Sequence, residues 1–287
     1  MHVETTSSPG PRSSVDVAAG FLEGLTIAPA PPAQEPMGFF TDSTLCIGCK
    51  ACEVACKQWN ALPADGNKWS GQSYDNTLHL SATTWRHVSF TEQALPNGDV
   101  KWLFNSDVCK HCTAAPCQEA CPTGSLIRNE WDDVYVQQDI CNGCGYCIVA
   151  CPFGVLGRSE SDGLAHKCTL CYDRQRDGLE PACAKACPTD SILFGPVEKL
   201  KEQARERVST LHARGTSEAY LYGADDAGEY KSLNAFFLLT EDPAAYNLPP
   251  APRRPSATMN KRYLWSALVG VSLTALSALA LATGKED

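Results

Sequence analysis

Sixteen cysteines fall into four groups of four along this chain of 287 residues. The groups are Cys46, Cys49, Cys52 and Cys56; Cys109, Cys112, Cys117 and Cys121; Cys141, Cys144, Cys147 and Cys151; and Cys168, Cys171, Cys183 and Cys187. So many thiols could form disulfides in a secreted chain, bind zinc in pairs, or hold iron–sulfur clusters. Composition alone does not choose among these chemistries, but the spacing within the groups does.

In the first and third groups two residues separate the first three cysteines and three residues precede the fourth. This spacing resembles that of two-cluster bacterial ferredoxins. Three thiolates at such short intervals can wrap three corners of a cubane, while the fourth leaves the loop on a short helix and faces elsewhere. A zinc site uses two separated pairs instead, and disulfides between residues three apart are strained. Proline follows the last cysteine of three groups, at Pro122, Pro152 and Pro188.

An internal repeat accompanies the cysteines. Residues 121–127 (CPTGSLI) match residues 187–193 (CPTDSIL), and residues 151–156 (CPFGVL) form a looser third copy. Each unit indicates a cluster loop, a helical turn, Cys-Pro and a short apolar strand, and such repetition is a strong sign of repeated architecture. The predicted fold is therefore α+β, with two ferredoxin-like two-cluster modules that carry insertions, plus one C-terminal transmembrane helix.

The first group carries a more specific resemblance. Residues 45–56 (LCIGCKACEVAC), followed by Trp59 and Asn60, resemble the iron–sulfur (beta) subunit of membrane-bound formate dehydrogenase. The resemblance covers residues 38–194, and the C-terminal helix extends it. Equivalent subunits of other molybdopterin reductases and of some nickel–iron hydrogenases share the four-cluster pattern. Nitrate reductase beta subunits replace one cysteine with tryptophan, and the dimethyl sulfoxide and polysulfide types generally lack a membrane helix.

The resemblance implies four [4Fe-4S] clusters and a nested pairing of the cysteine groups. Groups two and three would form one module, and groups one and four would form the other. The implied ligand sets are Cys46, Cys49, Cys52 and Cys187; Cys168, Cys171, Cys183 and Cys56; Cys109, Cys112, Cys117 and Cys151; and Cys141, Cys144, Cys147 and Cys121. Tandem pairing, of group one with two and of three with four, remains the alternative.

The resemblance also implies a role in electron transfer without catalytic residues in this chain. A separate pterin-binding subunit with molybdenum or tungsten would oxidise formate, and electrons would pass through the clusters to an integral membrane subunit, for which a cytochrome b is one candidate, and to quinone. The equivalent subunit of a hydrogenase or another molybdopterin reductase is the alternative, and a zinc-bearing scaffold is a third. The net charge of −9 argues against nucleic acid as a partner.

Positive residues beside the cysteines could tune such clusters. Nearby positive charge favours the reduced, more negative form of a cluster, and lysines adjoin ligands at Lys50, Lys57, Lys110, Lys167 and Lys185. The third group has none, so we expect the cluster on Cys141, Cys144 and Cys147 to have one of the lower potentials. The alternative is that these lysines point into solvent, as long basic side chains normally do.

An uncharged run at residues 264–282 predicts a membrane helix. Its 19 residues span roughly 28 Å at about 1.5 Å per residue, close to the thickness of a bilayer core. Tyr263 and Trp265 stand where an interfacial belt forms. Small residues recur every fourth position, as in a helix-docking face: Ser266, Gly270, Thr274, Ala278 and Ala282. We expect a single-pass protein of the cell membrane, and the side on which the clusters lie stays open.

The expected domains follow from these features. Residues 1–36 are rich in Pro, Ser and Ala, which indicates a flexible tail. Residues 37–195 form the cluster domain, with an insertion at 58–105 that holds four of the six tryptophans. Residues 196–260 are expected to be an amphipathic helix and a linker, and residues 263–283 the transmembrane helix.

Overall fold

The computed structural model describes residues 34–66, 68–72, 74–225, 230 and 232–283, so nearly all of the expected N-terminal tail lies outside the described residues. The helices are α2 (Ala51–Trp59), α3 (Pro116–Glu119), α4 (Tyr146–Ala150), α5 (Tyr172–Arg176), α6 (Ala182–Lys185), α7 (Val197–Ala213), η2 (Pro243–Tyr246), η3 (Pro255–Thr258) and α8 (Met259–Thr283). The strands are β1 (Met37–Asp42), β2 (Arg86–Ala94), β3 (Val100–Val108), β4 (Leu126–Arg128), β5 (Val134–Val136), β6 (Gly157–Arg158), β7 (Ala165–His166), β8 (Ile192–Pro196), β9 (Tyr220–Tyr222) and β10 (Ala235–Leu239). This mixture confirms the predicted α+β class.

A four-stranded sheet joins the two ends of the cluster-bearing region. Its order is β8-β1-β10-β9, with β1 parallel to β10 and antiparallel to β8. Phe40 of β1 stands opposite Phe236 on one side and Leu193 on the other. The sheet therefore brings the strand before the first cysteine group beside the strand after the fourth.

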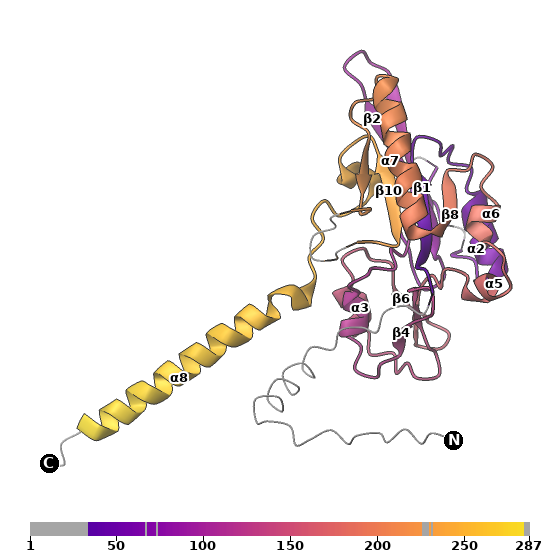
Figure 1. The fold of residues 1–287 in the computed structure, drawn as a ribbon. Coiled ribbons are helices and arrows are strands. Elements are labelled where there is room, and N and C mark those ends of the chain that lie inside the picture. Colours follow the sequence, from indigo (N-terminus) through magenta and orange to yellow (C-terminus); the bar gives the residue numbers. More distant parts are fainter. Residues whose placement is uncertain (1–33, 67, 73, 226–229, 231, 284–287) are drawn as a thin grey trace, which may run out of the picture. The chain divides into compact units, whose positions relative to one another are not determined.

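The two faces of this sheet bury different apolar clusters, because successive side chains of a strand point to opposite faces. Phe40, Phe236 and Leu238 pack with Leu200 and Ala204 of α7, which runs along one face (Figure 1). Phe39 and Phe237, the alternate residues, belong to the larger core that also contains most of the cysteines. The sheet thus separates the helix α7 from the cysteine-rich part.

Strands β9 and β10 were not anticipated from the sequence. They lie within residues 196–260, where the sequence indicated only a helix and a linker, and α7 occupies the expected helical part. All five residues of β10 are buried, as suits a strand covered on both faces. Most of this segment is therefore part of the folded body.

The hairpin of β2 and β3 forms the second part of the insertion at 58–105. Its register pairs Arg86 with Val108 at one end and Ala94 with Val100 at the other. Rings of Phe90, Trp102 and Phe104 contact one another on one face of the hairpin, with centroids 5.0–6.3 Å apart. A side chain at Gly48 would meet the Phe90 ring at 2.9 Å, so the hairpin packs directly on the first cysteine loop.

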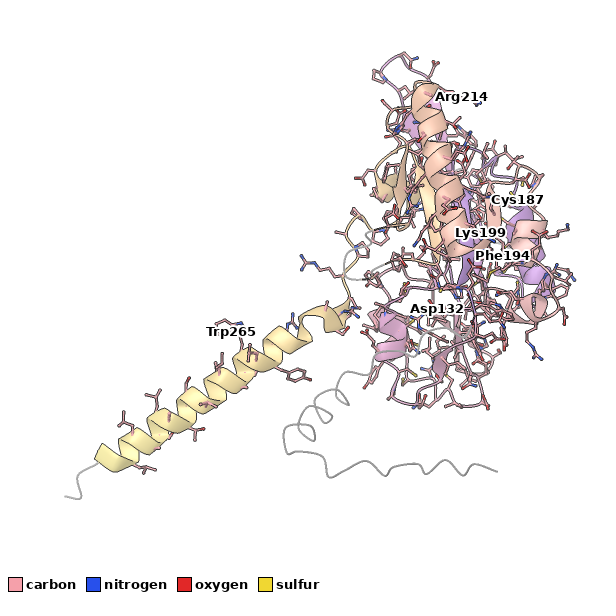
Figure 2. The ribbon with its side chains drawn as sticks, viewed as in Figure 1. Asp132, Cys187, Phe194, Lys199, Arg214 and Trp265 are labelled. Carbon is pink, nitrogen blue, oxygen red and sulfur yellow. The ribbon has the colours of Figure 1, made fainter. Side chains whose placement is uncertain are left out.

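The last helix, α8, carries the expected apolar run. Residues Arg262–Leu281 form the one candidate membrane span in the described part of the chain, with mean hydropathy 1.9. Trp265 projects from this helix (Figure 2) and is 68% exposed. The hydroxyls of Ser272, Thr274 and Ser277 donate to backbone carbonyls four residues earlier. These bonds satisfy polar groups that an apolar medium would otherwise leave without partners.

Candidate metal-cluster site

The first and third cysteine loops turn through left-handed backbone conformations immediately before a short helix. Gly48 and Lys50 have φ values of 67° and 60° before α2, and Gly143 and Gly145 have 68° and 81° before α4. Such angles suit glycine, which carries no Cβ. At Gly143 a Cβ would lie 2.2 Å from a backbone oxygen, so only glycine fits. The turns curl each loop so that its sulfurs face a common point.

The helices of the cysteine groups pack in a nested arrangement. Helix α2, which carries Cys52 and Cys56, packs against α6, which carries Cys183 (Figure 1). Helix α3, with Cys117, packs against α4, with Cys147. Group one therefore meets group four, and group two meets group three.

Two cavities show which sulfurs face each other in the outer pair of groups. One is lined by Cys46, Cys49, Cys52 and Cys187, together with Ser106 and Ile192. The other is lined by Cys56, Cys168, Cys171 and Cys183, together with Phe39 and Arg86. We call these sulfur set one and sulfur set two. In each set one cysteine comes from the partner group.

The inner pair of groups forms two further sets, seen in the electrostatic effects between thiols. Burial and then the charges of Cys109, Cys117 and Cys151 raise the pKa of Cys112 well above its usual value. Burial and then the charges of Cys121, Cys141 and Cys144 raise the pKa of Cys147 to about 11. We call these sulfur set three (Cys109, Cys112, Cys117, Cys151) and sulfur set four (Cys141, Cys144, Cys147, Cys121).

The four sets follow one another through the protein. The pKa of Cys52 in set one is raised to about 12, chiefly by burial; Arg86 and Ser106 oppose the increase, and the charge of Cys183 in set two contributes to it. Cys168 of set two is influenced in the same way by Cys109 of set three. Cys117 of set three is influenced by Cys147 of set four. The outermost sets each have an exposed cysteine, Cys49 in set one and Cys144 in set four.

Hydrogen-bond donors surround the sulfurs. The Leu170 N–H donates to Cys168 Sγ at 3.3 Å, and the hydroxyl of Ser125 lies 3.3 Å from Cys121 Sγ. Burial opposes ionisation of Cys121, but the hydroxyls of Ser125 and Thr123 and the backbone N–H groups of Leu126 and Thr123 outweigh it and lower the pKa of Cys121 to about 6. Donors of this kind stabilise negative charge on sulfur and tune cluster potentials. The surroundings therefore suit anionic sulfur.

The donor sets fit iron–sulfur cubanes. Every set offers four thiols and no carboxylate, as cubane ligation requires. Within the described residues, no group of three or more His, Cys, Asp or Glu side chains has the geometry that holds a single metal ion. A zinc ion binds sulfurs at about 2.3 Å around one centre, whereas a cubane binds each thiolate through a different iron and keeps the four apart. When bound, such a cluster accepts and releases single electrons.

The lysines beside the cysteines divide into two kinds. Lys110 and Lys167 are buried, with 1% and 2% of their surface exposed. Lys167 Nζ donates to Cys109 Sγ at 3.4 Å, and Lys110 Nζ lies 5.0 Å from the centre of the Phe237 ring. The side chain of Lys185 is 70% exposed. Sequence position beside a cysteine therefore did not by itself decide which lysine faces sulfur.

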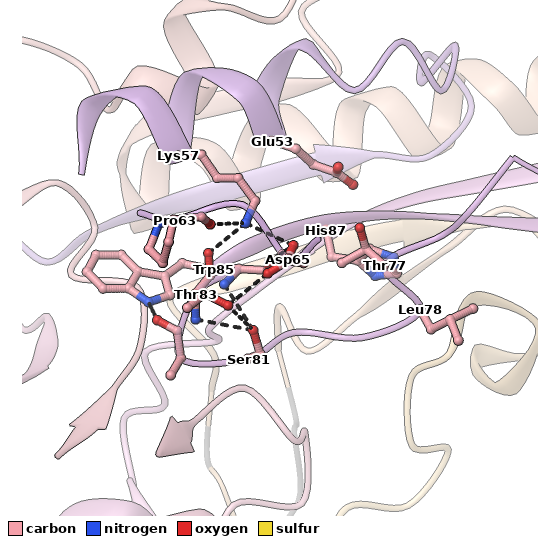
Figure 3. Close-up of polar contacts among 12 residues, drawn as sticks. Glu53, Lys57, Pro63, Asp65, Thr77, Leu78, Ser81, Thr83, Trp85 and His87 are labelled. Carbon is pink, nitrogen blue, oxygen red and sulfur yellow. Dashed lines mark hydrogen bonds and ion pairs between the residues drawn. The ribbon is translucent and has the colours of Figure 1, made fainter. Parts of the chain in front are cut away.

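The side chain of Lys57 contacts residues of the insertion rather than a cysteine sulfur. Its Nζ pairs with Asp65 at 2.9 Å and donates to the carbonyl oxygens of Pro63 and Thr83 (Figure 3). Asp65 in turn accepts from the hydroxyls of Thr83 and Thr84. These contacts fasten the loop after α2 to the segment that leads into β2.

One buried cation, Arg86, was missed from the sequence. It is the first residue of β2 and is 1% exposed. No cysteine lies near it in the sequence, and only the pairing of β2 with Val108 brings it beside the loop that begins at Cys109. No sequence signal other than a charged residue at the start of a strand could have found it.

Comparison with known proteins identifies the kind of cluster that these cysteines bind. Models described as 4Fe-4S dicluster domains match residues 45–125 and 100–197. The formate dehydrogenase iron–sulfur subunit of Haemophilus influenzae is 38% identical over 265 residues, which cover 90% of this chain and 82% of that protein. The formate dehydrogenase-O iron–sulfur subunit of Escherichia coli is 38% identical over 260 residues, covering 90% and 86%. A subunit of the E. coli anaerobic dimethyl sulfoxide reductase is 34% identical over 166 residues, covering 58% and 76%.

The fold and its sixteen paired thiols define an iron–sulfur electron-transfer protein with [4Fe-4S] clusters as cofactors, four in number for two dicluster modules. It is 38% identical to both formate dehydrogenase iron–sulfur subunits over most of their length. The protein belongs to the family of formate dehydrogenase iron–sulfur subunits, and the predicted resemblance is confirmed.

Proposed function

We propose that this chain passes electrons from a catalytic subunit, in which a molybdenum or tungsten pterin oxidises formate, through four clusters to a quinone-reducing membrane subunit. The observation that carries the proposal is the unbroken succession of sulfur sets one to four, with exposed cysteines only in the outermost sets. A succession of closely spaced sites suits movement of single electrons across the protein, because each step is short.

The proposed ligands of clusters one to four are sulfur sets one to four. The matched dicluster segments divide the protein by sequence and place group one with group two. The packing of α2 on α6 and the two cavities support the nested pairing instead, since ligands of one cubane must reach the same point. Cys56 is the decisive residue, because nested pairing gives it to cluster two and tandem pairing gives it to the cluster on Cys109, Cys112 and Cys117.

Paired serine variants test this assignment in the anaerobically purified complex. Nested pairing predicts that Cys56→Ser and Cys171→Ser alter the same electron paramagnetic resonance (EPR) signal. Tandem pairing predicts that Cys56→Ser alters the signal that Cys112→Ser alters. Iron analysis of each variant shows that a single cluster is affected, and agreement between the Cys56 and Cys112 variants would rule the nested sets out.

The direction of the succession follows from where the membrane helix begins. Arg254, shortly before η3 and α8, pairs with Glu119 of α3 at 2.8 Å, and the Ser256 hydroxyl donates to the same carboxylate. Helix α3 carries Cys117 and ends close to Cys121. The polypeptide therefore leaves for α8 beside sets three and four. We assign the cluster-four end to the membrane subunit and the cluster-one end to the catalytic subunit.

The apolar helix α8 supports attachment to the membrane by a single pass, with a neighbouring integral subunit such as a cytochrome b receiving the electrons. The segment contains no His, so it offers no imidazole ligand to a haem, and quinone chemistry falls to that partner. The test is co-purification: the complex should contain molybdenum or tungsten and should reduce a quinone analogue with formate.

A reductase partner is the second candidate, since one relative is a subunit of an anaerobic dimethyl sulfoxide reductase. A complex that reduces a sulfoxide with a quinol, and does not oxidise formate, would favour it. Nickel in the purified complex would instead indicate a hydrogenase.

A further inference from the structure

The guanidinium group of Arg86 lies between sulfur sets one and two. Its Nη2 donates to Cys183 Sγ of set two at 3.3 Å. Its Nη1 donates to the carbonyl oxygen of Ser106 at 3.0 Å and to the Ser106 hydroxyl at 3.2 Å. The guanidinium carbon is 4.7 Å from the centre of the Phe39 ring. The position is therefore fixed by two strands and by the core of the sheet.

Ser106 continues the connection to set one. Its Oγ lies 3.3 Å from Cys52 Sγ, and Ser106 is 1% exposed. A continuous series of hydrogen bonds thus runs from Cys183 through Arg86 and Ser106 to Cys52. Both ends of the series are cysteines of neighbouring sets, and the residues between them belong to strands β2 and β3.

A buried arginine is costly unless negative groups compensate its charge. In the described part of the chain no carboxylate forms an ion pair with Arg86, whereas Lys110, Lys50 and Arg207 each pair with one. The buried Lys167 resembles Arg86 in this respect, since its partners are a cysteine sulfur and backbone carbonyls. The groups that compensate Arg86 are sulfurs. Burial alone would lower the pKa of Arg86, but the charges of Cys183, Cys52 and Cys168 raise it instead. The charge of Arg86 is thus compensated by sulfurs of both set one and set two.

We propose that Arg86, with Ser106, is a positioning residue for electron transfer between clusters one and two, raising both midpoint potentials and linking the two clusters by hydrogen bonds. This inference rests on the ligand sets of the proposed function. In the step concerned one electron leaves one cluster and enters the other, so that one is oxidised and the other reduced by one electron, and no proton moves. A fixed cation beside both clusters lowers the energy of the electron at either place.

Arg86→Gln in the intact complex is the central test. The variant keeps a hydrogen-bonding group on a shorter side chain and removes the charge. The control is Lys185→Gln, which removes the same charge at the end of α6, two residues from Cys183, but from a side chain that is 70% exposed. Midpoint potentials of all four clusters are measured by EPR-monitored redox titration, and iron and sulfide content is determined for every variant.

In Arg86→Gln the midpoint potentials of clusters one and two are expected to fall by about 59 mV or more each. For one electron this corresponds to a tenfold decrease in the equilibrium constant for reduction. The control is expected to leave all four unchanged. Full iron and sulfide content with four potentials equal to those of the control would overturn the proposal. Arg86→Lys, which restores the charge, is expected to recover most of the shift.

Ser106→Ala tests the hydrogen-bonded link with little risk to folding. Loss of the hydroxyl beside Cys52 is expected to lower the midpoint potential of cluster one and to leave those of clusters three and four unchanged. An unchanged midpoint potential of cluster one would contradict the link. Potentials can be read with a chemical reductant, independently of formate. Failure of this inference therefore differs from failure of the proposed function, which would show as missing clusters or as absence of formate oxidation.

Discussion

Lys167 Nζ lies 3.4 Å from Cys109 Sγ and also donates to the carbonyl oxygen of Cys168 at 2.9 Å. The ammonium group thus touches sulfur set three while its own backbone neighbour belongs to set two. Burial would lower the pKa of Lys167, but the charges of Cys109, Cys117 and Cys168 raise it. A buried positive charge therefore stands at the junction of the two ferredoxin-like modules.

Lys167→Gln should lower the potentials of two clusters, the ones that we assign to sets two and three. The reason is the loss of a cation that favours the reduced state of both. We expect a decrease of about 59 mV or more in each, equal to a tenfold change for one electron. Redox titration checks this, with the exposed α7 residue Lys199 (Figure 2) mutated to Gln as the control. A decrease in the potential of only one cluster would show that the charge of Lys167 does not act on both sets.

The cluster on Cys141, Cys144 and Cys147 should titrate below clusters two and three. Its loop contains no lysine or arginine, whereas Lys167 lies against sets two and three. The signal can be assigned by its change in Cys144→Ser. Finding that this cluster has the highest potential of the four would overturn the argument from local charge.

Exposed apolar residues beside sulfur set one and beside sulfur set four should contact different partner subunits. Ile47 beside set one is 58% exposed, and Val149 on α4 beside set four is 89% exposed. A photo-crosslinking amino acid at position 47 should attach to the catalytic subunit, and one at position 149 to the membrane subunit. Mass spectrometry of the products identifies the partners, and the reverse pattern would reverse the direction of electron flow that we assign.

Asp133→Asn should stabilise the protein above neutral pH. Burial raises the pKa of Asp133 to about 7, and hydrogen bonds from Asn129 and Gln175 and the charge of Lys167 only partly oppose this, while Asp132 adds to it. The raised pKa means that this carboxyl contributes most stability below its unfolded pKa and loses it as the pH rises through about 7. Asn cannot ionise, so the variant escapes that loss.

The measurement for Asp133→Asn is anaerobic thermal unfolding at pH 6 and pH 8.5. The melting temperature of the variant should exceed that of the parent by at least about 2 °C at pH 8.5, which corresponds to roughly 1 kcal/mol for a chain of this size. The difference should shrink at pH 6. A constant difference at both pH values would point to packing rather than ionisation.

Deleting residues 263–283 should release the protein from membranes without loss of its clusters. The span is apolar, and the cysteine sets lie outside it. Membrane fractionation and iron analysis of the truncated chain provide the check, and a matched deletion within residues 1–33 is the control. Retention of the truncated chain in the membrane after carbonate washing would show that contacts other than α8 hold the protein at the membrane.

The cysteine groups could be recognised from the sequence because short spacings leave little freedom in how a loop can wrap a cubane. The pairing of β1 with β10 could not, since strands from opposite ends of the folded body meet through tertiary packing that local pattern does not encode. Arg86 was missed for the same reason, as its partner Cys183 is distant in sequence. Lys110, Lys167 and Lys185 all adjoin cysteines, yet only packing decides that two are buried and one is exposed.

Metal and sulfide analysis of anaerobically purified protein, joined to Mössbauer spectroscopy, tests the central claim most directly. We predict iron and acid-labile sulfide in equal amounts, with spectra of four [4Fe-4S] clusters per chain. Stoichiometric zinc, or a preparation without iron and without visible colour, would contradict the account.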